Sequence, residues 1–214
     1  KFVKLGSGAP PPPPAIAFVQ ATTGPATIQS LNSSVAVAYG SAQTAGNLNI
    51  VVVGWGDNTS SVSSVTDTRG NVYTRAVGPT TNTGIQQSIY YAKNIAAGSN
   101  TVTVAFSPAA SYPDVRILEY SGLDPASPLD GKAGASGSGT AANSGNAATL
   151  SANELVFGAG TTGAIFNAAG SGFVSRMINA YGNIAEDKTV SATGSYNATA
   201  TTNSSVWVMQ VATF

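Results

Sequence analysis

The sequence feature that most constrains the fold is the run Leu48–Trp55, in which Ile50, Val51, Val52 and Val53 follow one another without a polar residue. The run is too short for a helix with a polar face, and turn-forming residues bound it on both sides. Its β-branched side chains favour extended backbone. We therefore expect a strand that is buried on both faces of a sheet.

Further strand-like segments follow at short intervals, separated by Gly, Asn, Ser and Thr turns, and this spacing is typical of a β-sandwich or barrel. Hydrophobic and polar residues alternate cleanly in segment 101–106, and the closing segment 206–214 is apolar on both faces, which places it deep in a sheet. We find no long helical periodicity and no internal repeat. The expected strands are 16–20, 35–39, 48–55, 62–66, 71–77, 86–92, 101–106, 115–120, 147–150, 154–158, 173–178, 184–192 and 206–214.

Two connecting segments have a composition that predicts their role. Residues 67–71 read as a hairpin turn in which Gly70 supplies the positive φ angle. Residues 131–148 are almost entirely small and polar, so we expect either a long surface connection or a weak edge strand there. This segment is the internal boundary that the composition favours most.

The charge composition excludes several classes of partner. The 214 residues include nine acidic and nine basic side chains and no histidine. A protein that binds nucleic acid needs a basic footprint, and a protein that binds a membrane surface through charge needs a polybasic one. The uncharged polar surface that remains is typical of secreted β proteins. We therefore expect an extracellular or cell-surface location, with no nucleic-acid partner.

The chain contains no cysteine, so disulfides and thiolate metal sites are excluded. No segment approaches the roughly 20 apolar residues of a membrane span. We therefore expect no membrane insertion and no cofactor. A chain of this length buries enough surface for the core alone to hold a domain together.

Residues 1–15 form a separate N-terminal arm. A short apolar and basic segment, residues 1–5, is followed by Gly6-Ser7-Gly8 and then by consecutive prolines. Polyproline II rises about 3.1 Å per residue, which makes the prolines a semi-rigid spacer of about 15 Å. The folded body, residues 16–214, is predicted to be a single domain. The spacer residues are Pro10, Pro11, Pro12, Pro13 and Pro14.

Several segments together resemble a poorly characterised bacterial module that recurs in large extracellular and surface proteins. The resemblance covers most of residues 16–214. It implies a secreted β-sandwich and carries no established active site, and the free-standing proline arm departs from the module's usual multi-domain setting. The segments are 45–55, 65–73, 88–94, 118–124, 153–158 and 207–210.

The residue types leave little room for catalysis. A Ser-His-Asp triad is excluded because the chain has no histidine or cysteine, and zinc chemistry is disfavoured for the same reason. Glycoside hydrolysis needs only two carboxylates. Asp114, Glu119, Asp124 and Asp130 are the candidates, although nothing in the sequence sets two of them at the required separation. We expect no enzyme and no catalytic residue, and we keep a glycosidase-like activity as the third alternative.

Two further groups of polar residues have a structural and a functional interpretation. Asp57, Asn58, Asp67 and Asp124 suit a calcium ion chemically, but their spacing favours turns, so we predict no metal site. Glu119 shares a strand face with apolar residues and needs a partner, for which Lys93 and Arg75 are candidates.

Aromatic side chains offer apolar faces with polar tips, which suits them to sugar binding as well as to core packing. Core packing is favoured for Trp55 and Trp207, which belong to buried strands. For the tyrosines both interpretations stay open. The candidate glycan-binding residues are Tyr73, Tyr90, Tyr91, Tyr112 and Tyr181.

The arm supplies the leading functional hypothesis. Phe2, Val3 and Leu5 lie beyond a stiff spacer, where they can add as a donor strand to the sheet of a neighbouring copy. Each buried side chain would contribute roughly 1.5–3 kcal/mol before ordering costs. Such head-to-tail contacts generate open filaments when the rotation does not close. The alternative for the arm is a disordered linker left from a larger protein, and Phe2 points opposite to Val3 and Leu5.

These observations predict an all-β, jelly-roll-type β-sandwich with an extended N-terminal arm. The leading function is a structural subunit of an extracellular, pilus-like filament or surface assembly, in which copies of the chain form a homopolymer by N-terminal strand donation. The alternative is a carbohydrate-binding or adhesive surface module whose partner is a polysaccharide.

Overall fold

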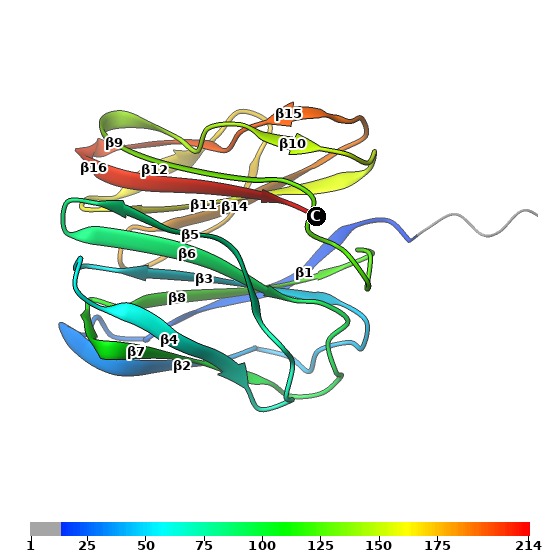
Figure 1. Cartoon of the computed structure of the whole chain (residues 1–214), viewed down its shortest axis with the longest axis horizontal. Coiled ribbons are helices and arrows are strands. Elements are labelled where there is room, and N and C mark those ends of the chain that lie inside the picture. Colours follow the sequence, from blue (N-terminus) through cyan, green and yellow to red (C-terminus); the bar gives the residue numbers. More distant parts are fainter. Residues whose placement is uncertain (1–13) are drawn as a thin grey trace, which may run out of the picture.

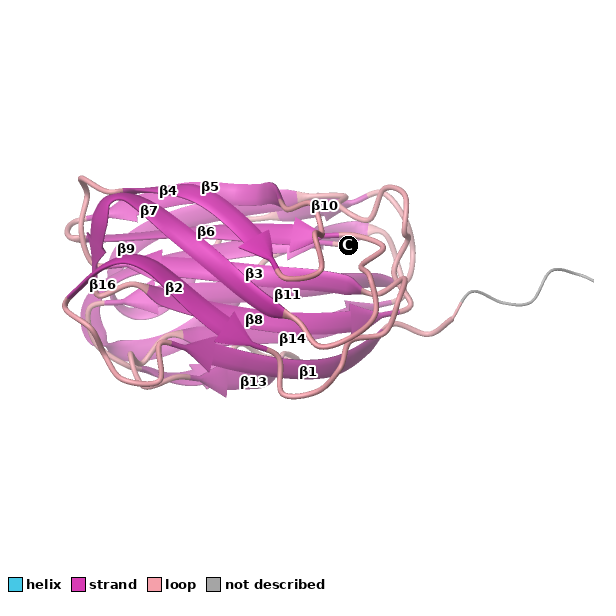
Figure 2. Ribbon diagram, turned by 90° about the horizontal axis from the view of Figure 1, so that it is seen from below, coloured by secondary structure: helices cyan, strands magenta, loops and turns pink. Residues whose placement is uncertain are grey.

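The computed structural model describes residues 14–214, and every regular element in them is a β-strand (Figure 2). This confirms the all-β prediction. None of these residues forms a helix long and apolar enough to cross a membrane. The strands are β1 (Ala17–Gly24), β2 (Leu31–Ala38), β3 (Leu48–Trp55), β4 (Ser61–Asp67), β5 (Thr74–Asn82), β6 (Ile85–Ala92), β7 (Thr101–Ser111), β8 (Asp114–Ser121), β9 (Lys132–Asn143), β10 (Ala147–Thr149), β11 (Glu154–Thr162), β12 (Phe166–Ala169), β13 (Val174–Ile178), β14 (Ile184–Val190), β15 (Gly194–Tyr196) and β16 (Thr199–Thr213).

The strands form a stack of antiparallel sheets (Figure 1). Two large sheets face each other in the middle of the molecule. One has the order β1-β8-β3-β6-β5. The other has the order β13-β14-β11-β16, and β16 also pairs with β9 and, near its start, with β12. The small sheet β2-β7-β4 covers the first large sheet, and the pair β10-β15 covers the second. The architecture is a β-sandwich, and its jelly-roll type stays a prediction.

The strand order of the first half of the chain recurs in the second half. Adding eight to each number in β1-β8-β3-β6-β5 gives β9-β16-β11-β14-β13, which is the order of five of the six strands of the second large sheet; the sixth, β12, pairs with the start of β16. The sequence shows no matching repeat. The physical reason is that a buried strand requires apolar residues at alternate positions but does not require particular ones.

The strand β3 is buried on both faces, as the sequence predicts. Ile50 and Val52 lie in the core between the two large sheets, while Val51 and Val53 lie in the core beneath the small sheet β2-β7-β4. Trp55 also packs in that second core. The third core lies on the far side of the second large sheet. Its larger members are Val156, Phe166, Ile184, Trp207, Met209 and Val211.

The structure tests the predictions for two connecting segments, residues 67–71 and residues 131–148. The turn after Asp67 exists and Gly70 has a φ of 72°. However, it joins β4 to β5, which belong to different sheets, so the predicted hairpin is wrong. A turn can serve either purpose because its local chemistry does not depend on where the next strand pairs. Residues 131–148 contain an edge strand, β9, which was one of the two alternatives for that segment.

Candidate functional site

The predicted donor strand and most of its spacer lie outside the described residues. Phe2, Val3, Leu5 and the first four prolines of the spacer belong to residues 1–13. The description begins at Pro14, which is exposed and lies outside regular structure. The chain then enters β1, an outer strand of the first large sheet, at Ala17.

The outer strand β9 has the features that a donated strand requires of its acceptor. Its pairing with β16 keeps an unbroken register from Lys132 to Gly139, and within residues 14–214 β16 is its one strand partner. Exposed and partly buried residues alternate along this stretch, and none after Lys132 is larger than serine. The side chain of Asn82 occupies one position, where its Nδ2 donates to the carbonyl oxygen of Gly137 at 2.7 Å. A strand edge that pairs with no second strand can accept a further strand.

Other outer strands of the large sheets have interrupted registers. The pairing of β1 shifts between Phe18 and Gln20, and that of β13 shifts between Ser175 and Met177. The pairing of β5 shifts twice. Because a bulge twists an edge and breaks its hydrogen-bonding pattern, these edges are poor templates for a further strand. The β9–β16 register also shifts, between Gly139 and Ala141, but its unbroken stretch from Lys132 to Gly139 is longer than any unbroken stretch of β1, β5 or β13.

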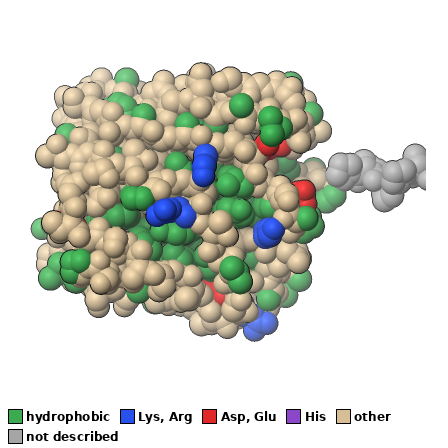
Figure 3. Space-filling model, viewed as in Figure 1, with side chains coloured by type: hydrophobic (Ala, Val, Ile, Leu, Met, Phe, Trp, Pro, Cys, Tyr) green, Lys and Arg blue, Asp and Glu red, His purple; other side chains and the backbone are tan. Residues whose placement is uncertain are grey.

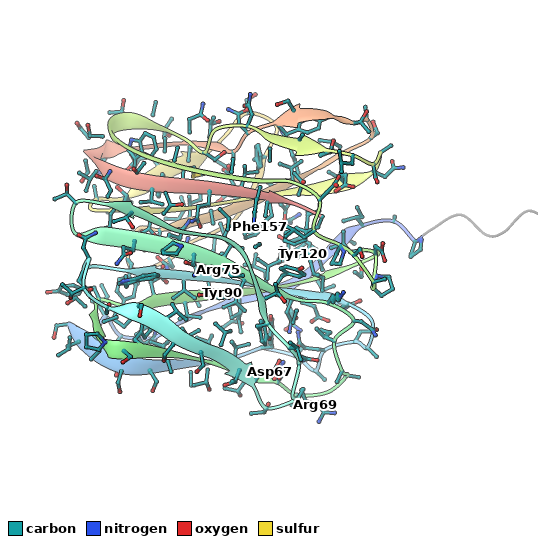
Figure 4. The ribbon with its side chains drawn as sticks, viewed as in Figure 1. Asp67, Arg69, Arg75, Tyr90, Tyr120 and Phe157 are labelled. Atoms are coloured by element: carbon teal, nitrogen blue, oxygen red, sulfur yellow. The ribbon has the colours of Figure 1, made fainter. Side chains whose placement is uncertain are left out.

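The five candidate tyrosines do not form one platform. Tyr73 and Tyr90 pack against the core beneath β2-β7-β4. Tyr91 lies on the opposite face of the first large sheet, where it packs against the core between the two large sheets and makes edge-to-face contact with Phe214. Figure 4 places Tyr90 beside Arg75. The tyrosines on β6 alternate faces because neighbouring residues of a strand point in opposite directions, so a shared surface is excluded for them.

Tyr73 has a structural role. Its hydroxyl donates to Oδ2 of Asp67 at 2.9 Å and accepts from Nδ2 of Asn49 at 3.2 Å. Burial and the neighbouring Asp67 carboxylate raise the pKa of Tyr73 well above its ordinary value. This side chain connects the turn after β4 to the core and is not available to a ligand.

Tyr112 and Tyr181 both contact the segment between β1 and β2 at one end of the molecule, which we name the tyrosine end (residues 25–32, 112–113 and 179–183). The backbone N–H of Tyr112 donates to the carbonyl of Ser30 at 3.2 Å, and the hydroxyl of Tyr181 accepts from the N–H of Gln29 at 3.3 Å. Tyr112 has a φ of 44°, in the left-handed region that is unfavourable for an aromatic residue. Both tyrosines are thus held by the segment between β1 and β2.

The tyrosine end carries exposed apolar side chains beside amides. Ile28 is 54% exposed, Leu31 is 62% exposed and Tyr112 is 53% exposed. The amide of Asn32 donates to that of Gln29 at 2.5 Å. Aromatic rings, aliphatic side chains and amides together are the groups that recognise sugars by stacking and hydrogen bonding.

A buried polar cluster crosses the interface between the two large sheets. Arg116 on β8 is fully buried, and its Nε lies 3.0 Å from Oδ2 of Asp114. Its Nη1 donates to the carbonyl oxygens of Gly160, at 3.0 Å, and Ile184, at 2.5 Å. Its Nη2 donates to Gln87 at 3.0 Å. One guanidinium therefore connects strands of both large sheets.

Amide side chains complete this cluster. Asn183 donates to Oδ2 of Asp114 at 2.9 Å, and Asn179 donates to its Oδ1 at 2.5 Å. Burial raises the pKa of Asp114, against the opposing influence of Arg116 and both amides. On the other side, Gln87 donates to the side chain of Gln210 at 3.0 Å. Asp114 is fully engaged in structure, so it is not a free catalytic carboxylate.

Glu119 is fully buried, and the prediction that it pairs with a cationic side chain is wrong. Its carboxylate accepts hydrogen bonds from Gln20 at 2.6 Å, Asn47 at 2.7 Å and the N–H of Thr44 at 3.1 Å. The two amides belong to β1 and to the segment before β3. Both are far from Glu119 in the sequence, so the sequence alone does not predict these contacts. Neutral donors satisfy the carboxylate where Lys93 or Arg75 was expected.

Three of the acidic residues considered for calcium stabilise turns instead. Asp57 accepts from the N–H groups of Ser60 and Ser111, both at 2.7 Å. Burial acts to raise its pKa, but these bonds prevail and lower the pKa to about 2. Asp67 accepts from Asn71 and Asn100, both at 2.8 Å. Asp124 accepts from the N–H of Ala126 at 2.8 Å. Their bonding agrees with the turn interpretation.

Asn58, the fourth calcium candidate, also serves the local structure. Its Nδ2 donates to the carbonyl of Asn82 at 2.9 Å, and its Oδ1 accepts from the N–H of Gly84 at 2.7 Å. Both partners belong to the turn between β5 and β6. Its side chain therefore fastens that turn to the segment after β3.

Two hollows, of about 350 and about 340 Å³, lie on the surface of residues 14–214. The first is lined by Val72, Tyr91 and Lys93. The second includes Arg176, which forms two bonds with Asp187, at 2.6 and 2.9 Å. Figure 3 shows how thinly charged side chains are spread over the visible face. Arg176 thus already has its carboxylate partner, while Lys188 also lines the second hollow.

The carboxylates of Asp130 and Glu154 lie together where β9, β11 and β16 meet. The sequence did not predict this pair. Burial and the neighbouring Asp130 raise the pKa of Glu154 to about 7. Glu186 on β14 is a separate case, since burial raises its pKa to about 7 and one of its oxygens has no donor. No local sequence motif predicts the Asp130–Glu154 pair or the burial of Glu186, because both depend on which strands pair.

Comparisons with protein-family models, with curated proteins and with solved structures found no match to this chain. The resemblance to an extracellular bacterial module therefore stays a prediction from the sequence.

Proposed function

We propose that the protein is a structural subunit of an extracellular filament or surface assembly, joined head to tail by N-terminal strand donation. The observation that carries the proposal is the outer edge of β9, whose register is unbroken from Lys132 to Gly139. The donor is residues 1–5, and the proline spacer gives it reach beyond its own domain. Because donor and acceptor are different surfaces, the contact repeats from copy to copy.

The dimensions of donor and acceptor agree. Five residues in a strand span about 17 Å, and the unbroken part of β9 spans about 26 Å, at roughly 3.3 Å per residue. The small side chains of β9 allow close approach of another backbone. Main-chain hydrogen bonds would supply affinity, and Val3 and Leu5, which share one face of the donor, would supply apolar burial.

Negative-stain electron microscopy of the full chain and of a chain without residues 1–14 tests this function. Filaments are expected only when the arm is present. The double variant Val3→Ser with Leu5→Ser should abolish them, because both side chains belong to one donor face. The matched control is Phe2→Ser on the opposite face, which should assemble like the full chain. Monomers in every sample would overturn the proposal.

The tyrosine end favours a second candidate function, a carbohydrate-binding or adhesive module. It offers the exposed ring of Tyr112 beside the amides of Gln29 and Asn32. Sedimentation with insoluble polysaccharides measures this function. Tyr112→Ala should reduce the bound fraction, while Leu150→Ala, another exposed apolar residue, should leave it unchanged. An equal bound fraction for both variants, or none for the full chain, would contradict sugar binding at this end.

A further inference from the structure

We infer that Asp130 and Glu154 form a binding site for a divalent cation of the calcium type. Three strand ends bring them together. The N–H of Asp130 donates to the carbonyl of Thr213 at 2.9 Å, and the N–H of Leu155 donates to the carbonyl of Phe214 at 2.7 Å. The end of β16 thus lies between the segment before β9 and the start of β11, where Glu154 is the first residue.

The position of Asp130 is fixed by its surroundings. Its Oδ2 accepts from the N–H of Leu150 and, at 3.4 Å, from that of Ser151. The N–H of Gly131 donates to the hydroxyl oxygen of Thr213 at 2.7 Å. A Cβ at Gly131 would collide with the carbonyl oxygen of Ala148, so only glycine permits this close approach. The carboxylate is held in place before any ligand arrives, which lowers the ordering cost of binding.

The observation that points to a ligand is the unsatisfied oxygen of Glu154. This residue is only 6% exposed, and its Oε2 is buried without a hydrogen-bond donor. Its acidic neighbour Asp130 can share a hydrogen bond with it only while one of the two holds a proton, and when both are ionised neither carboxylate satisfies the other. A buried anionic oxygen without a donor is costly unless a proton or a cation compensates it.

Other carboxylates in the described residues do not share this combination. Asp57 and Asp67 have both oxygens occupied by donors of their own turns, and Asp57 also accepts from the N–H of Ser111. Glu186 has a free oxygen, but the residue is fully buried and Lys188 is its cationic neighbour. Asp130 is only partly buried, so a cation has access to the pair from solvent.

The donor set indicates the class of cation. Carboxylate oxygens without histidine or cysteine suit a hard cation such as Ca²⁺. Residues 14–214 contain no cluster of three or more acidic, histidine or cysteine side chains that could hold a metal. Two carboxylates must therefore be completed by water and main-chain carbonyls. A site of this kind belongs with extracellular modules, whose dissociation constants are about 10⁻⁴–10⁻³ M.

Thermal unfolding of the full chain at pH 7.5 tests the site, with millimolar CaCl₂, with MgCl₂ and with a chelator. The midpoint should rise with Ca²⁺ and rise less with Mg²⁺, which prefers a tighter, octahedral shell. Asp130→Asn should remove the calcium response, and Asp124→Asn, at an exposed turn, should keep it. Terbium luminescence of the folded proteins measures binding independently of stability. It should be present in the full chain and lost in Asp130→Asn.

Two outcomes would overturn the inference. A full chain without a calcium-dependent midpoint and without terbium binding would show that the pair holds only a proton. A calcium response retained in Asp130→Asn would place binding elsewhere. Neither outcome depends on assembly, so this site and the proposed filament function stand or fall separately.

Discussion

The guanidinium of Arg116 on β8 donates a 3.0 Å hydrogen bond to the carbonyl oxygen of Gly160 on β11, and thereby connects the two halves of the chain. This is the central contact of a polar cluster inside an otherwise apolar interface. A buried cation is tolerated there because Asp114 lies beside it and other acceptors complete its shell. The two large sheets are therefore held in one relative position by directional bonds as well as by apolar packing.

Replacement of Arg116 should be strongly destabilising. Arg116→Met leaves the buried Asp114 without its ion pair and removes the guanidinium donor from two carbonyl oxygens. We expect a loss of about 3–5 kcal/mol in the free energy of unfolding, measured with urea. The matched control is Arg69→Met on an exposed turn, which should change it by less than about 0.5 kcal/mol. A loss below about 1 kcal/mol for Arg116→Met would contradict the role of the cluster.

Gly160 should not tolerate a larger side chain. A Cβ at this position would lie 2.5 Å from the ring of Phe166 and 2.9 Å from the sulfur of Met209. Gly160→Ala should cost about 1–3 kcal/mol through overpacking. Gly40→Ala provides the control, because a Cβ there meets nothing within 4 Å and its φ is not in the left-handed region. Equal unfolding midpoints in urea for the two variants would refute this packing argument.

Stability should decrease as the pH rises through the neutral range. Burial raises the pKa of Glu186 from its ordinary 4.5 to about 7, so the folded state binds a proton that the unfolded state releases. Its contribution is fully present below pH 4.5 and is lost as the pH rises towards 7, on the order of 3 kcal/mol. Glu186→Gln should flatten the unfolding free energy measured between pH 5 and 8. Glu154 titrates in the same window, so a smaller slope should remain. An unchanged slope would show that Glu186 is ionised throughout.

Asp57 should give stability the opposite pH dependence, with a contribution that is lost as the pH falls. Its pKa is about 2 in the folded state, below its ordinary value of 3.8, so its contribution is present above pH 3.8 and is lost as the pH falls through 2. Asp57→Asn should lower the free energy of unfolding at pH 7 by about 1–3 kcal/mol, because the backbone donors of Ser60 and Ser111 lose a charged acceptor. The difference from the unaltered chain should shrink in acid titrations. A difference that persists undiminished at pH 2 would contradict the role of the charge.

The sequence by itself determined the elements that depend on local chemistry. β-branched and alternating residues specify β3 and β7 as strands, because each strand's side chains point alternately to its two faces. Gly70 and Asp67 specify a turn, because glycine accepts a positive φ and the carboxylate binds nearby N–H groups. The class of the fold follows from such segments and their spacing.

Tertiary structure decided everything that depends on which strands pair. The amides around Glu119, the carbonyls around Arg116 and the approach of Asp130 to Glu154 all join segments far apart in the chain. The same is true of Tyr112 and Tyr181, which meet through the loop between β1 and β2. Local sequence does not encode these meetings, because a strand's hydrogen bonds are satisfied by any neighbour in register and only the packing of complete sheets selects one.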